Sequence, residues 1–301
     1  MIYPIEPILN YRIWGGDFLK TSLNRSDIEE PIGEVFLVSA MLEADSLIDG
    51  MGMQSFYQNH PEYFGLSMKQ FPLRINLIEA KDNLSVQLHP RKENLGNLEL
   101  PRGVEEFWYV IDAASDSELV LGLNTRSIDD VKESISNNSW DSILRRLPTR
   151  EGDYTFLPAG SVHAIGKGCL IYEVTYNVDV TYRLYDYDRV EKKTGHKRVL
   201  HHEESLANIN LEDVVELAKV DGNYTTIIDQ ETGFKIDRIK CEKTLTIKQD
   251  NFYFYTIIRG HGTINGLATT LFGTYFVPKG DDEVKLSGNF ELLRVTFKEF
   301  H

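Results

Sequence analysis

Short runs of β-branched, aromatic and other apolar residues, separated by Gly, Asn and Asp, recur along most of the chain and constrain its fold more than any other feature. Such residues favour strands, and turn-forming residues at this spacing are typical of antiparallel connections. The pattern therefore predicts a mainly β fold. In the first two thirds we expect strands over Arg74–Ala80, Leu84–His89, Glu106–Ile111, Leu119–Leu123, Tyr154–Leu157 and Leu170–Thr175.

One segment of this region has helical periodicity instead. Ser127–Leu147 opens on a residue suited to an N-cap and carries Asp129 and Asp130 in its first turn. We expect one helix here, or two helices broken near Asn137 and Asn138. Because the segment interrupts strands and does not alternate with them, a doubly wound α/β fold does not fit.

The length of 301 residues exceeds the roughly 100–200 residues of a usual domain, so we expect two units. The polar, acidic stretch His201–Lys219, with a weak helical tail, is the candidate connector, and we place the boundary near Leu206. This gives residues 1–205, with a helical insertion near 127–147, and residues 206–301. Further strands are expected over Phe234–Lys240, Thr244–Lys248, Tyr253–Arg259, Gly262–Ile264, Thr274–Val277, Val284–Leu286 and Glu291–Phe297.

A short sequence motif, which we call the internal echo, is repeated in the two halves of the chain. The run Phe-Leu-Pro-Ala-Gly at Phe156–Gly160 recurs as Phe-Val-Pro-Lys-Gly at Phe276–Gly280. Together with the strands that precede each run, the echo favours a pair of related jelly rolls, although unrelated β domains remain an open alternative.

Charge and composition exclude several classes of protein. Asp and Glu total 46 against 32 Lys and Arg, so the net charge of −14 opposes binding to nucleic acid or to an anionic membrane. No apolar run approaches the ~18 residues of a membrane helix, and the first residues lack the pattern of a signal peptide. We therefore expect a cytoplasmic protein. Cys169 and Cys241 form no disulfide or zinc motif, and we expect both to be reduced.

The most chemically informative motif is Ser85–Pro90, which reads SVQLHP. Strand alternation places Gln87 and His89 on one face, where two buried polar side chains need a partner. Glu106 and His163 follow as further candidate ligands. A set of imidazole, carboxylate and amide groups suits zinc, and also manganese, iron or cobalt. A hydrogen-bonded structural role for each residue remains the alternative.

Several separate motifs lie along the chain. They read FPLRINLIEAKDNLSVQLHP (Phe71–Pro90), EFWYVI (Glu106–Ile111), LPAGSVHAIGKG (Leu157–Gly168), TYRLYDYDR (Thr181–Arg189) and RIWGG (Arg12–Gly16). These motifs resemble those of the cupin-type mannose-6-phosphate isomerases. The resemblance implies two cupin jelly-roll domains with a helical insertion in the first. It also implies one zinc ion per chain, bound by Gln87, His89, Glu106 and His163, and an active-site arginine at Arg183.

The reaction that the resemblance implies is the reversible interconversion of mannose 6-phosphate and fructose 6-phosphate through an enediolate. Arg183 is the candidate catalytic and substrate-binding residue because its guanidinium suits a phosphate or a developing oxyanion. Its alternative is a structural salt bridge with Asp186 or Asp188. Ser85 and Arg74 are further candidates for binding the sugar phosphate.

Three positions depart from the usual pattern of these isomerases. Phe36 replaces a tryptophan, Val104 replaces a lysine two residues before Glu106, and Asn76 stands where lysine is frequent. Arg74, on the same strand face as Asn76, restores the positive charge or lies on the surface. The departures leave two alternatives open: an isomerase of a different sugar or sugar phosphate, and a non-catalytic, metal-containing, sugar-binding cupin.

The C-terminal half is predicted to be metal-free. Glu283 takes the place that corresponds to His163 in the internal echo, and Tyr253–Arg259 lacks a Gln-x-His pair. Gly260-His261-Gly262 is expected to be a turn. The sequence predicts no oligomeric state.

Overall fold

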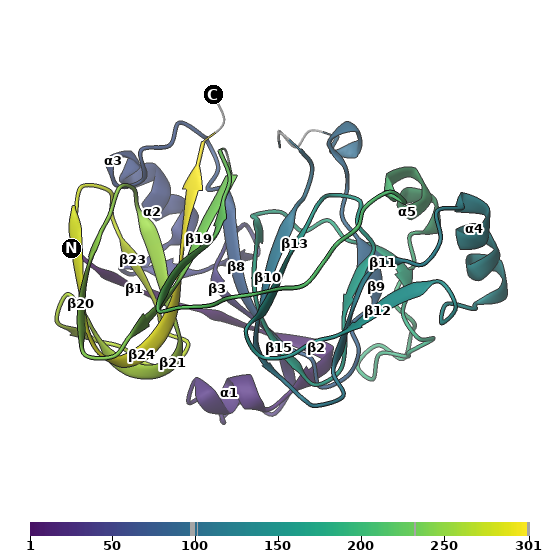
Figure 1. The fold of residues 1–301 in the computed structure, drawn as a ribbon, viewed down its shortest axis with the longest axis horizontal. Helices are drawn as coiled ribbons and strands as arrows, with labels where there is room; N and C mark the ends of the chain where they lie inside the picture. The colour runs from purple at the N-terminus through teal and green to yellow at the C-terminus, as the bar shows by residue number, and fades with distance from the viewer. Residues whose placement is uncertain (97–99, 101, 232, 300–301) are drawn as a thin grey trace.

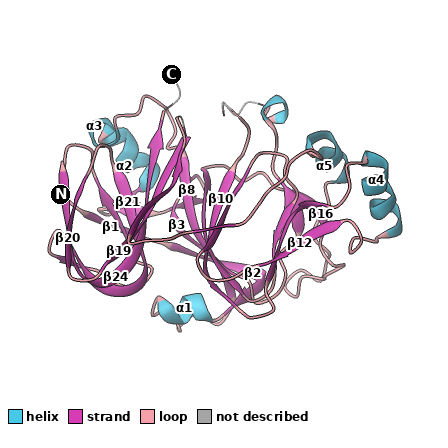
Figure 2. Ribbon diagram, viewed as in Figure 1, coloured by secondary structure: helices cyan, strands magenta, loops and turns pink. Residues whose placement is uncertain are grey.

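The computed structural model describes residues 1–96, 100, 102–231 and 233–299 and arranges them as two β units side by side (Figure 1). Strands make up most of the regular structure, and the helices lie at the periphery (Figure 2). The predicted mainly β class is therefore confirmed.

Two antiparallel sheets face each other in the first unit. The seven-stranded sheet has the order β17 (Ala218–Lys219), β13 (Asp153–Leu157), β10 (Glu106–Ala113), β15 (Cys169–Tyr176), β8 (Leu73–Glu79), β3 (Ile32–Val38), β2 (Ile8–Gly16). The five-stranded sheet has the order β12 (Leu144–Pro148), β11 (Glu118–Leu123), β14 (His163–Ile165), β9 (Val86–Leu88), β16 (Tyr182–Tyr185).

The third sheet joins both ends of the chain. Its order is β18 (Tyr224–Asp229), β19 (Gly233–Cys241), β24 (Glu283–Lys298), β21 (Tyr253–Ile264), β23 (Thr274–Val277), β1 (Tyr3–Glu6), β6 (Leu47–Ile48), β7 (Met51–Gly52), with β20 (Thr244–Lys248) on β24 and β22 (Leu267–Ala268) on β21. Strands β4 (Ala40–Met41) and β5 (Ala44–Asp45) pair separately. The third sheet thus takes strands from both sides of Leu206, and the division into residues 1–205 and 206–301 stays a prediction about folding units.

The helices are short. They are α1 (Phe18–Ser22), α2 (Met53–Asn59), α3 (Pro61–Phe64), α4 (Ile128–Asn137), α5 (His202–Asn208) and one turn of 3₁₀ helix at Lys92–Asn94. The predicted connector, His201–Lys219, was expected to be helical in its C-terminal part. Its helix, α5, lies instead at the N-terminal end of the connector, and the C-terminal end forms strand β17.

The prediction of a helical insertion is correct for the first half of the segment and wrong for the second. Helix α4 begins as predicted, with the Ser127 hydroxyl accepting the backbone N–H of Asp130 at 3.3 Å, and it ends where Asn138 adopts a left-handed conformation. The expected continuation toward Leu147 is wrong. Residues Leu144–Pro148 instead form β12, because β11 offers an unpaired edge along which Leu119 and Leu147 become partners.

Two predicted breaks in the C-terminal strands are also wrong. Gly260-His261-Gly262 is not a turn, because β21 runs through it and stays paired with β24 from Phe254 to Ile264. A register shift between Ile257 and Arg259, followed by a positive φ of 70° at Gly260, bends the strand without ending it. The segments Val284–Leu286 and Glu291–Phe297 likewise merge into the single long strand β24.

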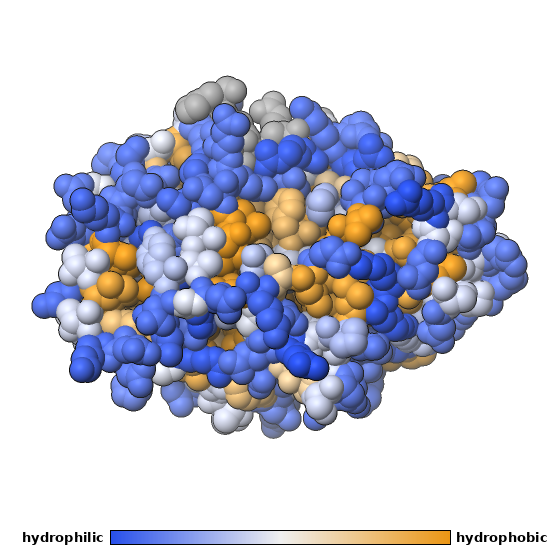
Figure 3. Space-filling model, in the orientation of Figure 1, coloured by the Kyte–Doolittle hydropathy of each residue, from blue (hydrophilic) through white to orange (hydrophobic). Residues whose placement is uncertain are grey.

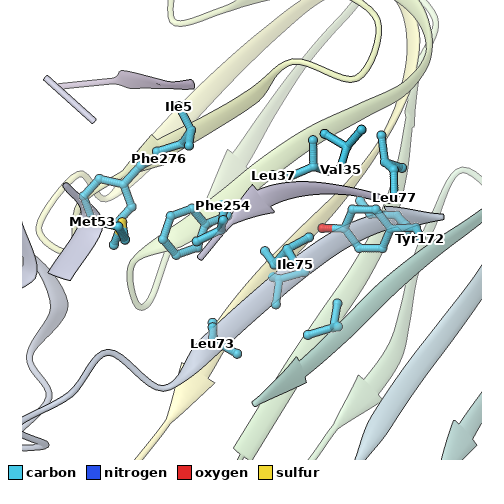
Figure 4. Packing of buried hydrophobic residues seen from close by; sticks show 14 of the residues in the cluster. Ile5, Val35, Leu37, Met53, Leu73, Ile75, Leu77, Tyr172, Phe254 and Phe276 are labelled. Carbon is cyan, nitrogen blue, oxygen red and sulfur yellow. The ribbon is translucent and has the colours of Figure 1, made fainter. Parts of the chain in front are cut away.

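The main hydrophobic core lies between the two units. In Figure 4, Leu73, Ile75 and Leu77 of β8 lie with Val35, Leu37 and Tyr172 of neighbouring strands on one side and Phe254 and Phe276 of the C-terminal sheet on the other. Alternation turns the intervening residues Arg74 and Asn76 to the opposite face. The central strands of the seven-stranded sheet are therefore buried on both faces.

Hydrophilic residues cover most of the face shown in Figure 3, with hydrophobic residues in separate groups. Within the part of the chain that the structure describes, no helix combines the length and hydropathy needed to cross a membrane. Cys169 and Cys241 are both buried and free.

The N-cap of α4 gives a test of the local structure. Replacing Ser127 by Ala (S127A) removes the side-chain acceptor for the Asp130 N–H and should lower the free energy of unfolding by about 1 kcal/mol. Ser136→Ala, at an exposed position inside the same helix, is the control and should cause no such loss. Urea denaturation measures both, and an equal loss in the two variants would contradict the capping role.

Candidate metal centre and active site

A cavity of about 320 Å³ lies between the two sheets of the first unit. The five-stranded sheet contributes a row of directly opposed residues, in which His163 of β14 pairs with Gln87 of β9 and Gln87 pairs with Arg183 of β16. From the other sheet, Glu106 of β10 and Glu173 of β15 reach the same cavity. Residues that are far apart in sequence thus converge on one polar cavity.

Strand alternation in Ser85–Pro90 places its polar side chains as predicted. Gln87 and His89 line the cavity, whereas Val86 and Leu88 are fully buried in the hydrophobic cluster under α4. Ser85 also lines the cavity, and its hydroxyl donates to Gln87 Oε1 at 3.0 Å. That hydrogen bond orients the amide and leaves the second lone pair of its oxygen open.

Both histidines are held by backbone carbonyls. His89 Nδ1 donates to the Val180 carbonyl at 2.7 Å, and His163 Nδ1 donates to the Ser161 carbonyl at 2.9 Å. Since a carbonyl only accepts, the proton of each neutral ring lies on Nδ1, and Nε2 carries a free lone pair. This is the arrangement in which an imidazole binds a metal ion through Nε2.

Glu106 completes the group. Its Oε1 lies 2.9 Å from His89 Nε2 and its Oε2 lies 3.7 Å from His163 Nε2, and one ligand atom from each residue falls within 4.8 Å of the others. Among the described residues, His163 Nε2 and Glu106 Oε2 are buried atoms without a hydrogen-bond partner, and His89 Nε2 has only the Glu106 carboxylate beside it. Such orphaned atoms are costly, and their convergence fits a cation with nitrogen and oxygen ligands.

The protonation states of His163 and Glu106 favour the same use. Burial would lower the pKa of His89, but the Glu106 carboxylate outweighs it and holds that pKa above its usual value, so a metal ion would displace a proton from this ring. Burial lowers the pKa of His163 to about 4, although Glu106 opposes the shift, so this ring is neutral near pH 7. Burial would also raise the pKa of Glu106, but the two adjacent histidines outweigh it and hold that pKa below its usual value. A neutral imidazole next to an ionised carboxylate is ready to bind a metal ion.

Arg183 is the half-buried cation of the cavity. Its guanidinium makes no hydrogen bond or ion pair to any residue that the structure describes, and its Nε is buried without a partner. The alternative salt bridges are absent there, because Asp186 pairs with Arg189 and Arg198, and Asp188 pairs with Lys197. Arg183 is therefore free to bind an anionic or oxygen-rich ligand.

Arg74 is 7% exposed and lines the cavity, so the alternative of a surface position is wrong. Its Nη1 donates to the Val178 carbonyl at 2.8 Å, its Nε has no described partner, and its guanidinium lies 5.4 Å from the centre of the Phe36 ring. Phe36 thus forms an aromatic wall of the cavity. Val104 is 3% exposed and packs outside the cavity lining.

Glu173 is a functional candidate that the sequence analysis did not identify. Its carboxyl accepts Asn76 Nδ2 at 2.7 Å and Trp108 Nε1 at 3.0 Å, and it lines the cavity. Burial raises its pKa to about 8, and the charge of Glu106 adds to the shift. The available signal was a lone carboxylate within the otherwise uncharged strand LIYEVT, because a charge at such a position needs a reason.

Comparison with known proteins gives consistent matches over nearly the whole chain, although no protein-family model matches. The chain is 32% identical over 294 residues to the probable mannose-6-phosphate isomerase GmuF of Bacillus subtilis, covering 93% of this chain and 88% of that protein. It is 31% identical over 313 residues to the mannose-6-phosphate isomerase ManA of the same organism, covering 96% of each.

Solved structures agree with these matches. The mannose 6-phosphate isomerase from Bacillus subtilis superposes with a TM-score of 0.87 at 25% identity, covering 98% of this chain and 99% of that one. A mannose 6-phosphate isomerase bound with zinc and yttrium superposes with a TM-score of 0.75 at 15% identity, covering 99% of each, and shares the fold.

Removing one imidazole tests the metal centre. His163→Ala should abolish the binding of one divalent metal ion per chain, because it deletes one of the converging donors, while the apolar cores preserve the fold. Elemental analysis after dialysis measures the metal, and circular dichroism with thermal unfolding measures the fold. His261→Ala, at an exposed position in β21, is the matched control and should keep the metal. Metal retained at one ion per chain in H163A would refute the ligand role.

Proposed function

The chain belongs to the mannose-6-phosphate isomerase family, and we propose that its cavity interconverts mannose 6-phosphate and fructose 6-phosphate through an enediolate. One observation carries the proposal. Three buried ligand atoms that converge within 4.8 Å, from His89, Glu106 and His163, share a cavity with the Arg183 guanidinium, which is unpaired among the described residues. A metal ion and a cation placed together suit a reaction that develops negative charge on substrate oxygen atoms.

The proposed cofactor is one zinc ion per chain, held by His89, Glu106 and His163 with Gln87 as the fourth ligand. Imidazole, carboxylate and amide donors suit zinc, and other divalent ions bind the same types of ligand. When bound, the ion supplies a Lewis acid that polarises the oxygen atoms on C1 and C2 of the sugar. Ser85 acts on this centre through its hydrogen bond to Gln87, and it remains a proposed substrate contact.

The isomerisation needs a group that removes a proton from C2 of the open-chain aldose and returns it to C1. The proton of the C2 hydroxyl moves to the oxygen on C1 in the same conversion, so no atoms are gained or lost. Glu173 is the proposed base for the carbon proton. Hydrogen bonds from Asn76 and Trp108 fix its carboxyl at the cavity wall. A pKa raised by burial toward neutrality lets it both accept and return a proton.

Arg183 and Arg74 are the proposed substrate-binding cations. The Arg183 guanidinium donates to the oxygen atoms that gain negative charge, since charge-assisted hydrogen bonds strengthen as the charge develops. Arg74, with its Nε open, donates to sugar oxygens deeper in the cavity. The proposed partner is thus a small-molecule sugar phosphate, and the proposed location is the cytoplasm.

A coupled assay tests the reaction. Protein of known metal content should form fructose 6-phosphate from mannose 6-phosphate, and a chelator should abolish the turnover until a divalent metal is restored. Glucose 6-phosphate and unphosphorylated mannose serve as comparison substrates. Faster turnover of either one would assign a different sugar to the site. Binding of sugar without exchange of the C2 proton in heavy water would show a non-catalytic, sugar-binding cupin.

Replacing the proposed base gives a separate prediction. Glu173→Gln should lower kcat by about a hundredfold or more, because general bases contribute on this scale. The amide side chain of Asn76, whose Oδ1 has no described partner, can rotate to accept the new N–H, so the fold and the metal should be retained.

The direction in which turnover changes with pH gives a second test of Glu173 as the base. Proton removal requires the ionised carboxylate, so turnover of the unsubstituted protein should rise as the pH increases through the pKa of Glu173. This rise should be absent from E173Q. Glu118→Gln, at an exposed position in β11, is the control with an unchanged profile. An E173Q variant with full turnover would exclude Glu173 as the base.

A further inference from the structure

The C-terminal unit has a cavity of its own, of about 540 Å³, which we call the second cavity. Arg294 of β24 lines it, whereas the neighbouring residues Leu293 and Val295 belong to the core between the two units. Because side chains alternate along a strand, the second cavity lies on the face of the C-terminal sheet that is turned away from this core. It is therefore separate from the cavity of the first unit.

The two cavities occupy corresponding places in their sheets. Strands β3, β8, β15, β10 and β13 are neighbours in that order in the first unit, as are β18, β19, β24, β21 and β23 in the C-terminal sheet. The internal echo fixes the register, since Leu157 and Val277 hold the same place in it. Leu157 pairs with Glu106, and Val277 pairs with Tyr253. Tyr253 thus stands at the position of Glu106.

The pairing of the strands relates the remaining polar residues of the two faces. The corresponding positions are Trp108 and Tyr255, Glu173 and Arg294, Asn76 and Asp237, and Arg74 and Lys235. Both carboxylates of the first cavity are thereby replaced, one by a phenol and one by a guanidinium. Within the described part of the chain, no three imidazole, thiol or carboxylate groups of the second cavity lie close enough together to hold a metal ion. A ligand here would bind the side chains directly.

Tyr224 forms a fixed aromatic wall of the second cavity. Its hydroxyl accepts Arg294 Nη2 at 2.6 Å and donates to Asp237 Oδ2 at 3.2 Å, and Arg294 Nε donates to the same carboxylate at 2.7 Å. Arg294 and Asp237 are both buried, whereas Tyr224 is 46% exposed. The hydroxyl is thus held in the interior while the ring stays open to solvent. A ring fixed in this way can pack against C–H groups of a ligand at a small cost in conformational entropy.

Most charges in the second cavity are compensated. Arg294 pairs with buried Asp237, and Lys235 Nζ lies 3.3 Å from Asp250 Oδ2. The lining comprises three cations, three carboxylates, one amide and one aromatic ring: Lys235, Lys248, Arg294, Asp250, Asp282, Glu283, Gln249 and Tyr224. Such a lining has no strong preference for an anion or a cation. It is also too polar for an apolar ligand, since Tyr224 contributes the single aromatic ring.

We propose that the second cavity is a metal-independent binding site for a neutral polyhydroxylated molecule, a free hexose or a related polyol. The Tyr224 ring packs against the C–H groups of the ligand. Lys235 donates to its hydroxyl groups, and the Asp250 carboxylate accepts from them. Hydroxyl groups both donate and accept, so they match a lining in which ammonium and carboxylate groups lie side by side. The inference does not depend on the reaction proposed for the first cavity.

Hydrogen exchange read by mass spectrometry locates the site. Titration of D-mannose should slow amide exchange in peptides that contain β18 and residues 248–250. The first cavity is built from other strands, so binding there is read from different peptides. Tyr224→Ala should raise the mannose concentration for half-maximal protection of β18 about tenfold, because the aromatic contact is lost. Tyr224→Phe keeps the ring and should retain most of the affinity.

A second pair of variants tests the polar contacts. Lys235→Met removes a donor at the cavity wall and should also weaken the protection of β18 by mannose. Lys285→Met, at an exposed position in β24 outside the lining, is the matched control and should behave as the unsubstituted protein does. Thermal unfolding of every variant checks the fold. If Y224A does not fold, the comparison of K235M with K285M still decides the proposal.

The charge of the ligand is tested with related sugars. D-Gluconate carries a negative charge near pH 7 and D-glucosamine a largely positive one, and both should protect β18 less than D-mannose at equal concentration. Stronger protection by either charged sugar would overturn the assignment of a neutral ligand.

The outcomes separate this proposal from the proposed function. Absence of protection in the β18 peptides of the unsubstituted protein would overturn the site. Protection that is equal in the unsubstituted protein, Y224A and K235M would also overturn it, because a general effect of sugar on stability acts on all three alike. Y224A should isomerise mannose 6-phosphate at the unsubstituted rate, since the second cavity takes no part in that reaction. If the protein isomerises no sugar phosphate, the proposed function fails, and the exchange experiment still decides the second site.

Discussion

Burial of the seven-stranded sheet on both faces is the constraint on which the rest of the molecule depends. Along β8, Leu73, Ile75 and Leu77 enter the core between the two units, and Arg74 and Asn76 between them enter the cavity. The apolar face stabilises the sheet through the hydrophobic effect. This stabilisation lets the other face carry buried charged groups, whose removal from water costs free energy and does not stabilise the fold.

Those charged groups stabilise one another only in part. Glu106 and Glu173 are both nearly fully buried on neighbouring strands of the same face, with Arg74 as a nearby cation. Removing two carboxylates from water is expensive unless protons, hydrogen bonds or cations compensate. Asn76 and Trp108 hydrogen-bond Glu173, and burial keeps this carboxyl closer to its protonated form. Glu106 instead faces the Nε2 atoms of His89 and His163. One buried face thus holds two carboxyl groups whose pKa values are shifted in opposite directions, which suits the two different roles proposed for them.

Several features were predictable because they depend on residues close together in sequence. Alternation along Ser85–Pro90 was enough to place Gln87 and His89 on one face, and the N-cap at Ser127 located the start of α4. Glu173 was missed although it is the lone charge in the strand LIYEVT, because only the tertiary structure shows that this strand is buried along its whole length. Strand β12 was missed because the helical periodicity of Ser127–Leu147 extends past Asn138, and only the free edge of β11 makes Leu144–Pro148 a strand.

By itself, the sequence determined the strand-rich class, the acidic surface, the face shared by Gln87 and His89, and the types of residue available for metal binding. These properties follow from composition and from a periodicity of two residues. The tertiary structure alone decided that β1 completes the C-terminal sheet, that Arg183 has no carboxylate partner among the described residues, and that Arg12 faces the same cavity from another sheet. The first and the last depend on segments more than 100 residues apart, which are brought together by the packing of the buried faces of the sheets. The second depends on which nearby arginines and lysine pair with Asp186 and Asp188, and the sequence alone does not decide among these partners.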